Sequence, residues 1–287
     1  MKRIGIYIAI CAALLCLWAP GARAADAKRI VFVAGSASHG QAAHAYYPGF
    51  SYLADVLVEN TDGVEVEVLR GWPEDEAVLE GADAVVIGSD AGKLIRKNLD
   101  HFKKLTEAGV GIACIHYTLD VREEPAEKAM LRAIGGFYDT HWSVNPTWTA
   151  EFTELPDHPI TRGVEPFKIR DEWYYHMRFR EDMEGVTPIL TAVPPDKTRE
   201  GPDGPHSGNP HVRKRKGMPE HVAWAHERPN GGRGFGFTGL HSHWNLANTG
   251  FRTILLNACL WTAGAEVPEE GVDSDDPSHR ELAEYLP

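Results

Sequence analysis

The chain has 287 residues, of which 43% are hydrophobic, and its 41 acidic and 29 basic side chains give a formal net charge of −12. This composition is that of an ordinary folded protein and excludes disordered, collagen-like and coiled-coil chains. The negative charge opposes binding to nucleic acid and to anionic lipid, so the expected partner is a small molecule. The oligomeric state is left open.

The first 24 residues have the pattern of a Sec-type signal peptide. Lys2 and Arg3 precede an apolar stretch, Ile4–Trp18, and small residues at Ala22 and Ala24 occupy the two positions that signal peptidase recognises. The apolar stretch is short for a membrane span. We therefore expect an exported protein, periplasmic or extracellular, with no membrane attachment after cleavage.

Short apolar runs alternate with helical patterns in the first half of the chain. The runs predict strands at 29–36, 64–71, 82–90 and 109–116, and apolar spacings of three and four predict helices around 50–57 and 94–105. Such alternation is typical of βαβ units around a parallel sheet. We expect strands 29–36, 82–90 and 109–116 to be parallel neighbours, with helices on both faces and the ligand site at their carboxyl ends.

The second half of the chain predicts strands with few helices between them, and so antiparallel additions to the sheet. The predicted strands lie at 148–155, 167–179, 187–193, 221–227 and 233–241. Residues 194–219, rich in Pro, Gly and charge, predict a long surface loop. A last amphipathic helix begins near Phe251 and ends at Gly264, and it closes one domain, 25–265. The acidic tail, 266–287, is expected to be loosely ordered.

Several familiar catalytic motifs are missing from the sequence. The chain has no Gly-x-Ser-x-Gly elbow, Walker loop, His-Glu-x-x-His helix or Cys-x-x-Cys pair. Cys114 and Cys259 remain after signal cleavage, and each lies in an apolar pattern. In an oxidising compartment they could form a disulfide, and the alternative is a pair of buried free thiols.

Several of the fourteen histidines follow predicted strand ends or turns: His39, His44, His116, His141, His241 and His243. The carboxyl ends of parallel strands meet at one edge of a sheet, so we expect His39, His116, His141 and His241 to line one pocket there. Imidazole can act as an acid, a base or a metal ligand near neutral pH. Taken singly, each could also be a hydrogen-bonded surface or core residue.

The stretch DEWYYHMRF, 171–179, has the two-residue period of a strand. One face would carry Trp173, Tyr175, Met177 and Phe179 and belong to the core. The other face would carry Glu172, Tyr174, His176 and Arg178. Burying those four polar groups is costly without partners, so this face is either part of a site or a solvated edge.

Five strings in order resemble the ThuA-like (trehalose utilisation) family of the class I glutamine amidotransferase-like superfamily. They are GVGIACIH ending at His116, GGFYDTHW at 135–142, DHPITRG at 157–163, DEWYY at 171–175, and GRGFGFTGLHSHWN at 232–245 followed by LLNACLWTAG. The resemblance covers nearly the whole mature chain. It implies a flavodoxin-like three-layer α/β fold with a mainly parallel central sheet and antiparallel additions in the second half, and a role in the breakdown of sugars or keto-sugars.

The chain departs from the amidotransferase pattern at the nucleophile. Active members of that superfamily place a Cys on a Gly-flanked turn and a His followed by an acid after a late strand. Here 114–118 reads CIHYT without flanking glycines, and Cys114 is expected inside the strand. His241 resembles the late-strand His but is followed by Ser242 and His243. Glutamine hydrolysis is therefore not expected.

Our leading hypothesis is an exported carbohydrate-processing enzyme (a lyase, hydrolase or isomerase) in which His116, His141, Glu172 and His241 are the acid–base groups. Proton abstraction beside a sugar carbonyl would use such groups without a covalent nucleophile. Other polar and aromatic side chains near them are expected to contact the sugar: His39, His44, Trp142, Tyr174, His176, His243 and Trp244.

Two alternatives stay open. Three imidazoles, or two with a carboxylate, could hold a divalent metal that polarises a carbonyl, although no local His spacing on a helix signals such a site. The cofactor is otherwise unknown. A non-catalytic sugar-binding protein on the same scaffold would bind its ligand without turnover.

Overall fold

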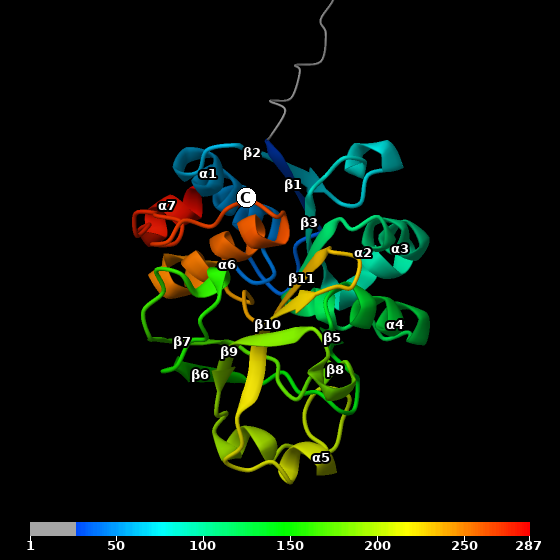
Figure 1. The fold of residues 1–287 in the computed structure, drawn as a ribbon. Helices are drawn as coiled ribbons and strands as arrows, with labels where there is room; N and C mark the ends of the chain where they lie inside the picture. Colours follow the sequence, from blue (N-terminus) through cyan, green and yellow to red (C-terminus); the bar gives the residue numbers. More distant parts are fainter. Residues whose placement is uncertain (1–26) are drawn as a thin grey trace, which may run out of the picture.

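The computed structural model describes residues 27–287, and Figure 1 shows a central sheet with helices on both sides. Seven strands make up this sheet, in the order β2-β1-β3-β4-β11-β10-β9. The signal peptide expected at residues 1–24 lies outside the described part of the chain. Among residues 27–287, no helix combines the length and the hydropathy that a membrane-spanning helix needs.

Three strands of the first half are parallel neighbours, as the sequence predicts. They are β1 (Lys28–Ala34), β3 (Ala84–Gly88) and β4 (Gly111–Ile115), and β2 (Val64–Arg70) pairs with the outer side of β1. Side chains of a strand point alternately to opposite faces, so Phe32 of β1 enters one core and Val33 enters the other. This burial on both faces explains the continuous apolar runs in the sequence.

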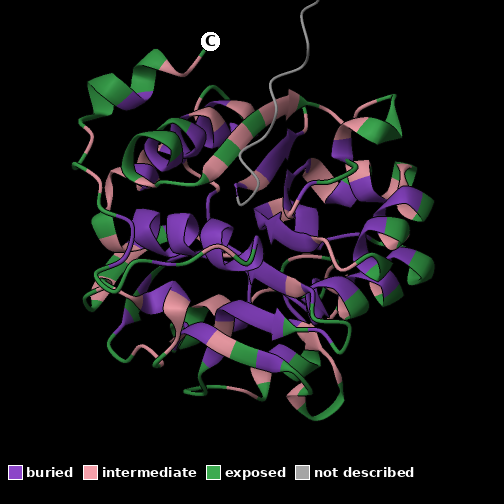
Figure 2. Cartoon of the chain, turned by 45° about the horizontal axis from the view of Figure 1, so that its top comes forward, coloured by how far each residue is buried: buried purple, intermediate pink, exposed green. Residues whose placement is uncertain are grey.

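The helices divide between the two faces of the sheet (Figures 1 and 2). One face is covered by α1 (Tyr46–Asn60) and α6 (Thr249–Thr262), and the other by α2 (Lys93–Lys97), α3 (Leu99–Glu107) and α4 (Glu124–Ala133). Phe50 of α1 packs in the first core, and Phe102 of α3 packs in the second. The expected flavodoxin-like three-layer fold is confirmed.

The two cysteines of the described chain lie in different cores. Cys114 of β4 belongs to the core beneath α3 and α4, and Cys259 of α6 belongs to the core on the opposite face. Both are buried free thiols. The sheet lies between Cys114 and Cys259, so the structure has two buried free thiols and not the disulfide that the sequence left open.

The second half adds three strands to the sheet. β11 (Arg233–Phe237) lies parallel to β4, and β10 (Glu220–Glu227) and β9 (Val186–Ala192) continue the sheet in antiparallel pairs. The antiparallel additions expected from the sequence are therefore present at one edge. Within residues 27–287, the structure has seven short 3₁₀ segments: Glu76–Leu79, Asp90–Gly92, His116–Leu119, Pro159–Thr161, Glu181–Met183, Asp196–Arg199 and His243–Ala247.

Two predicted strands of the second half lie outside the central sheet. β6 (Thr147–Phe152) pairs only with β7 (Phe167–Glu172), and β5 (Gly136–Phe137) pairs with β8 (Arg178–Phe179). The strand expected over 167–179 thus ends at Glu172, and the two-face interpretation of this stretch is wrong. Three successive side chains, Trp173–Tyr175, are all buried, because the chain leaves the extended path and packs on several sides at once.

The segment after residue 265 differs from the loosely ordered tail that its acidic composition predicts. It includes α7 (His279–Glu284), which begins with a capping box between Ser278 and Glu281. Leu282 is fully buried, and the Tyr285 hydroxyl donates to Asp55 Oδ2 at 2.7 Å. A few apolar anchors hold this segment on the domain although its average composition is acidic.

The stretch 194–219 is a long connection between β9 and β10, as predicted, and it carries one short helix, α5 (Pro210–Arg213). Arg199 in this loop is fully buried, and its Nη1 donates to Glu220 Oε1 at 2.8 Å. Arg215 donates to the same oxygen at 2.8 Å. These ion pairs fasten the loop to the first residue of β10.

Candidate functional site

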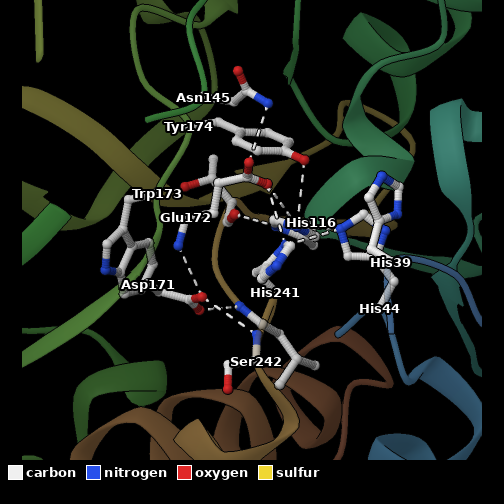
Figure 3. Close-up of polar contacts among 12 residues, drawn as sticks. His39, His44, His116, Asn145, Asp171, Glu172, Trp173, Tyr174, His241 and Ser242 are labelled. Atoms are coloured by element: carbon white, nitrogen blue, oxygen red, sulfur yellow. Dashed lines mark hydrogen bonds and ion pairs between the residues drawn. The ribbon is translucent and has the colours of Figure 1, made fainter. Parts of the chain in front are cut away.

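Polar side chains gather where β1, β3, β4 and β11 end, at the carboxyl edge of the sheet (Figure 3). Each strand is followed by at least one of them: His39 and His44 after β1, Asp90 after β3, His116 after β4, and His241 after β11. Glu172, the last residue of β7, reaches the same place from the small sheet. We call His44, His116, Glu172 and His241 the histidine–glutamate cluster.

His116 lies at the centre of this cluster and is fully buried. Its Nδ1–H donates to the Thr238 carbonyl at 2.7 Å, which leaves the lone pair on Nε2. That Nε2 atom lies 3.1 Å from His44 Nε2, 3.3 Å from the Tyr174 hydroxyl and 3.4 Å from Glu172 Oε2. The hydrogen bond to Thr238 thus fixes the orientation of the ring, and Nε2 is the nitrogen that faces the rest of the cluster.

His44 is held in a similar way. Its Nδ1 donates to the Asp90 carboxylate at 2.7 Å, and its Nε2 lies 3.0 Å from His241 Nδ1. Burial lowers the pKa of His44, although the hydrogen bond to Asp90 opposes that effect. Burial also acts on Asp90, but the hydrogen bonds from His44 and Ser38 outweigh it and lower the pKa of this carboxyl. His44 is therefore the more neutral imidazole, paired with an ionised carboxylate.

Glu172 and His241 form the more exposed half of the cluster. Glu172 Oε2 lies 3.3 Å from His241 Nδ1, and Asn145 donates to the other carboxylate oxygen at 3.3 Å. Burial raises the pKa of Glu172, but the interactions with His116 and His241 prevail and lower it to about 2. The hydrogen bond with Glu172 raises the pKa of His241 against the effect of burial. The two imidazoles in contact, His44 and His241, thus have pKa values shifted in opposite directions.

The backbone around the cluster is constrained. Asp171 is buried, and its carboxylate accepts the N–H of Leu240 at 2.7 Å and that of Ser242 at 3.4 Å, which fixes the peptide that carries His241. His44 and His116 have φ values of 47° and 54°, in the left-handed region that side chains with a Cβ disfavour. Such strain persists only where surrounding contacts hold it, and it is frequent at functional sites.

Exposure is graded across the cluster. His116 and His44 are 0% and 2% exposed, whereas the side chains of Glu172 and His241 are 20% and 29% exposed. His39 lies further out, with 54% of its side chain exposed, and its ring packs at a tilt against that of His44, at 4.2 Å between centroids. The cluster therefore faces solvent through His241 and Glu172, with the two buried imidazoles behind them.

In the part of the chain that the structure describes, two sets of side chains could hold a metal ion. The four donor atoms of the histidine–glutamate cluster all lie within 4.8 Å of one another, and so do donors from His39, His44 and Asp90. Both sets include His44, but through different ring nitrogens, because its Nδ1 faces Asp90 while its Nε2 faces the cluster.

Three residues predicted for the acid–base or sugar-binding site lie outside the histidine–glutamate cluster: His141, Trp142 and His176. His141 is exposed, and its N–H donates to the Pro205 carbonyl. Trp142 stacks on His176 at 4.5 Å between ring centroids, and the Arg178 guanidinium lies over its ring. His176 Nδ1 in turn lies 3.9 Å from Glu220 Oε2. His141 and Trp142 follow a turn, and His176 follows β7, which lies outside the central sheet, so the strand-end argument did not apply to them.

His243 and Trp244 face the C-terminal segment. His243 Nε2 donates to the Leu282 carbonyl at 2.9 Å, and the Trp244 ring packs on that of His279 at 5.3 Å between centroids. Both side chains therefore help to anchor α7 in the position that the structure gives it. Tyr174, by contrast, lies beside the histidine–glutamate cluster, with its hydroxyl 3.3 Å from His116 Nε2.

Sequence reasoning missed two carboxylates that support the cluster. Asp90 directly follows β3 at the same edge as His116, so the strand-end rule would have found it had carboxylates been considered with the histidines. Asp171 had no such signal, because its role depends on the folded position of Leu240 and Ser242.

The position of Cys114 differs from that of a catalytic thiol. Cys114 is fully buried inside β4, and burial raises its pKa well above the ordinary range. The turn that follows the strand is occupied instead by His116. The local structure therefore presents an imidazole where an amidotransferase would present its nucleophile.

Comparisons with known proteins agree with this fold. A ThuA-like protein from Parabacteroides merdae matches with a TM-score of 0.56 and 14% identity, over 89% of this chain and 96% of that one. A ThuA-like protein from Bacteroides uniformis matches with a TM-score of 0.54 and 16% identity, over 85% and 94% of the two chains. The N-terminal domain of mmIFT52 matches with a TM-score of 0.52 and 9% identity, over 84% of this chain and all of that domain.

These structural likenesses are at low identity and show the fold alone. A search of curated proteins gives no match to the chain. The family comparison is more specific, because the model described as ThuA, trehalose utilisation, matches residues 30–262. That match spans most of the sequence, and the chain therefore belongs to the ThuA family.

Proposed function

We propose that the chain is an exported enzyme of carbohydrate breakdown that transfers protons at the histidine–glutamate cluster. The observation that carries the proposal is the contact between two imidazoles with oppositely shifted pKa values, His44 and His241, at the carboxyl edge of the sheet. Groups whose environments separate their pKa values in this way are the usual acid and base of an active site.

The shifts suggest a role for each group. Near neutral pH, His44 is the neutral ring with a free Nε2, suited to accept a proton, and His241 is the ring that keeps its proton beside Glu172. Tyr174 stays protonated, because burial raises its pKa well above the ordinary value, and its hydroxyl can donate to a substrate oxygen. His116 connects these groups through its Nε2.

This set of groups suits removal of a proton beside a sugar carbonyl. A base takes the proton from the carbon next to the carbonyl, and the C–H electron pair moves into an enolate. In an elimination, the bond to the glycosidic oxygen then breaks as an acid protonates that oxygen. An isomerisation instead returns the proton to a neighbouring carbon. Neither reaction requires a covalent nucleophile.

Three further observations support a sugar as the substrate and an exported location. The family description, trehalose utilisation, indicates a carbohydrate-related role. The net charge of −12 opposes polyanionic partners such as nucleic acid. The first 24 residues have the composition of a signal peptide. Glutamine hydrolysis has no support, because the thiol of Cys114 is buried within a strand.

The test is a panel of glycosides and 3-keto-glycosides incubated with the purified protein, with products identified by mass spectrometry. We expect conversion of at least one carbonyl-bearing sugar, with loss of conversion in Glu172→Gln. A matched control is Glu220→Gln, which changes a buried carboxylate outside the cluster. Saturable binding without any product would overturn the proposal and favour the sugar-binding alternative.

A further inference from the structure

We propose that His44, His116, Glu172 and His241 bind one divalent transition-metal ion. The inference goes beyond the proposed reaction, because it rests on the positions of four donor atoms and on the hydrogen bonds behind them. With an ion bound, the Nε2 lone pair of His44 is a ligand, so proton transfer through that atom belongs to the metal-free protein. The metal would be held by three imidazole nitrogens and one carboxylate oxygen, from four different strand ends.

The first argument is the spacing of the donors. Around the cluster, His44 Nε2 lies 3.1 Å from His116 Nε2, and His116 Nε2 lies 3.4 Å from Glu172 Oε2. Glu172 Oε2 lies 3.3 Å from His241 Nδ1, which lies 3.0 Å from His44 Nε2. Two ligands that each lie about 2.1 Å from one ion, at angles of about 90° to 110°, are separated by about 3.0 to 3.4 Å. The four neighbouring separations all fall in that range.

The second argument is the direction of the lone pairs. The Nδ1 atoms of His44 and His116 are both engaged as donors, to a carboxylate and to a backbone carbonyl. In neutral rings both Nε2 atoms are then acceptors, and they face each other at 3.1 Å. Two buried acceptors in contact repel each other, and a cation between them, either an added proton or a metal ion, would remove that repulsion.

The hydrogen bonds behind the rings favour the metal. Histidines that bind metals usually donate their other N–H to a carboxylate or a backbone carbonyl, which fixes the ring and increases its basicity. His44 does so with Asp90, and His116 does so with the Thr238 carbonyl. A lone proton would not require three rings and a carboxylate to converge on one point.

The set of donors also restricts the kind of ion. Imidazole nitrogens suit zinc, iron, nickel and copper, whereas magnesium and calcium prefer oxygen ligands. The partial exposure of Glu172 and His241 leaves the ion accessible from the solvent side. An oxygen ligand such as the carbonyl of a keto-sugar could then bind to the ion and be polarised by it.

The second candidate set is better understood as support for the first. The Asp90 carboxylate already accepts from His44 Nδ1 through one oxygen and from the Ser38 hydroxyl through the other, so each oxygen has a hydrogen-bond partner. His39 is half exposed and its Nδ1 contacts the Ser38 hydroxyl at 2.6 Å. We therefore assign one ion, on the Nε2 side of His44.

The test measures metal binding directly, on protein purified without a polyhistidine tag, stripped with chelator and equilibrated with zinc, manganese or nickel chloride. After dialysis, elemental analysis is expected to find one ion per chain for at least one metal. The melting temperature is expected to rise with metal concentration, because the ion binds the folded state.

Variants locate the ion. His116→Ala and the isosteric Glu172→Gln are expected to weaken binding at least 10-fold, and Asp90→Asn by about 10- to 100-fold through its effect on His44. His279→Ala, which changes an exposed histidine on α7, is the matched control and is expected to bind normally. Circular dichroism of each variant shows whether it is folded, and Glu172→Gln provides the answer if His116→Ala is not.

Two results would overturn the inference: no retained ion with any of the three metals, or equal affinity in wild type and Glu172→Gln. The outcome is separate from that of the proposed reaction. Metal binding without turnover of any sugar would support the metal site and reject the proposed reaction. Turnover by the metal-free protein would support the reaction. In that case the retained-ion measurement alone would still decide whether the site exists.

Discussion

Two carboxylates of the molecule, the partly buried Glu172 and the buried Glu220, have the same charge and differ in their partners. Burial raises the pKa of both Glu172 and Glu220, yet hydrogen bonds lower each to about 2. Glu172 is surrounded by imidazoles, whereas Glu220 accepts from Arg199 and Arg215 in addition to lying near His176. A guanidinium keeps its charge at every physiological pH, and an imidazole exchanges its proton near neutrality. The pairing of Glu220 with arginines is therefore suited to holding the loop in place, and the pairing of Glu172 with histidines is suited to proton transfer.

The largest expected effect concerns the histidine side of this comparison. His116→Ala is expected to lower turnover of the converted sugar by about 10² to 10⁴-fold, the usual contribution of a positioned acid–base group. Turnover and melting temperature should be measured on the same preparation. A large loss of melting temperature with unchanged turnover per folded molecule would mean that His116 only caps β4.

A change at Glu220, the carboxylate paired with arginines, is expected to lower the stability of the fold. Glu220→Gln leaves the fully buried Arg199 without its ionic partner, so the free energy of unfolding is expected to fall by about 3 kcal/mol. Urea denaturation measures this loss. Turnover per folded molecule should stay at the wild-type level, and a drop comparable to that of Glu172→Gln would erase the distinction between the two carboxylates.

Acid should remove the stabilisation that Glu220 provides. Its pKa in the folded protein, about 2, lies below its ordinary value of 4.5, so the folded state favours the ionised form. That contribution is complete above about pH 5 and is lost as the pH falls towards 2. The difference in unfolding free energy between wild type and Glu220→Gln is therefore expected to shrink over this range. A constant difference would show that the ion pair is not its source.

The smallest effect on turnover is expected for a change at Cys114, a buried thiol that belongs to neither carboxylate pairing. Cys114 is fully buried and its pKa is raised, so little reactive thiolate is present. Cys114→Ser should leave turnover unchanged, and iodoacetamide should not label this residue in the native protein, as peptide mass spectrometry would show. Rapid labelling would indicate an accessible thiol and reopen nucleophilic chemistry.

The sequence predicts the cluster where a simple geometric rule applies. Continuous apolar runs indicate strands buried on both faces, and parallel strands bring their carboxyl ends to one edge. That reasoning places His39, His116 and His241 near one another, and the structure has them there. Asp90 follows from the same rule.

The rule does not extend to residues that follow turns or leave a strand early. His141 lies after a glycine turn whose direction depends on packing with the loop around Pro205. The prediction of one strand over 171–179 is wrong because the backbone leaves the extended conformation after Glu172. The Trp173 and Tyr175 side chains then pack against aromatic rings on different sides. Long-range packing of this kind has no local signature in the sequence.

The left-handed backbone at His39, His44 and His116 has a consequence for anyone who engineers this protein for heat tolerance. Glycine fits such positions better than any residue with a Cβ, so a search for stabilising substitutions would select them first. Each replacement would relieve strain and remove an imidazole at the same time. A heat-tolerant design that left these three positions free to vary would therefore gain robustness by deleting its own site.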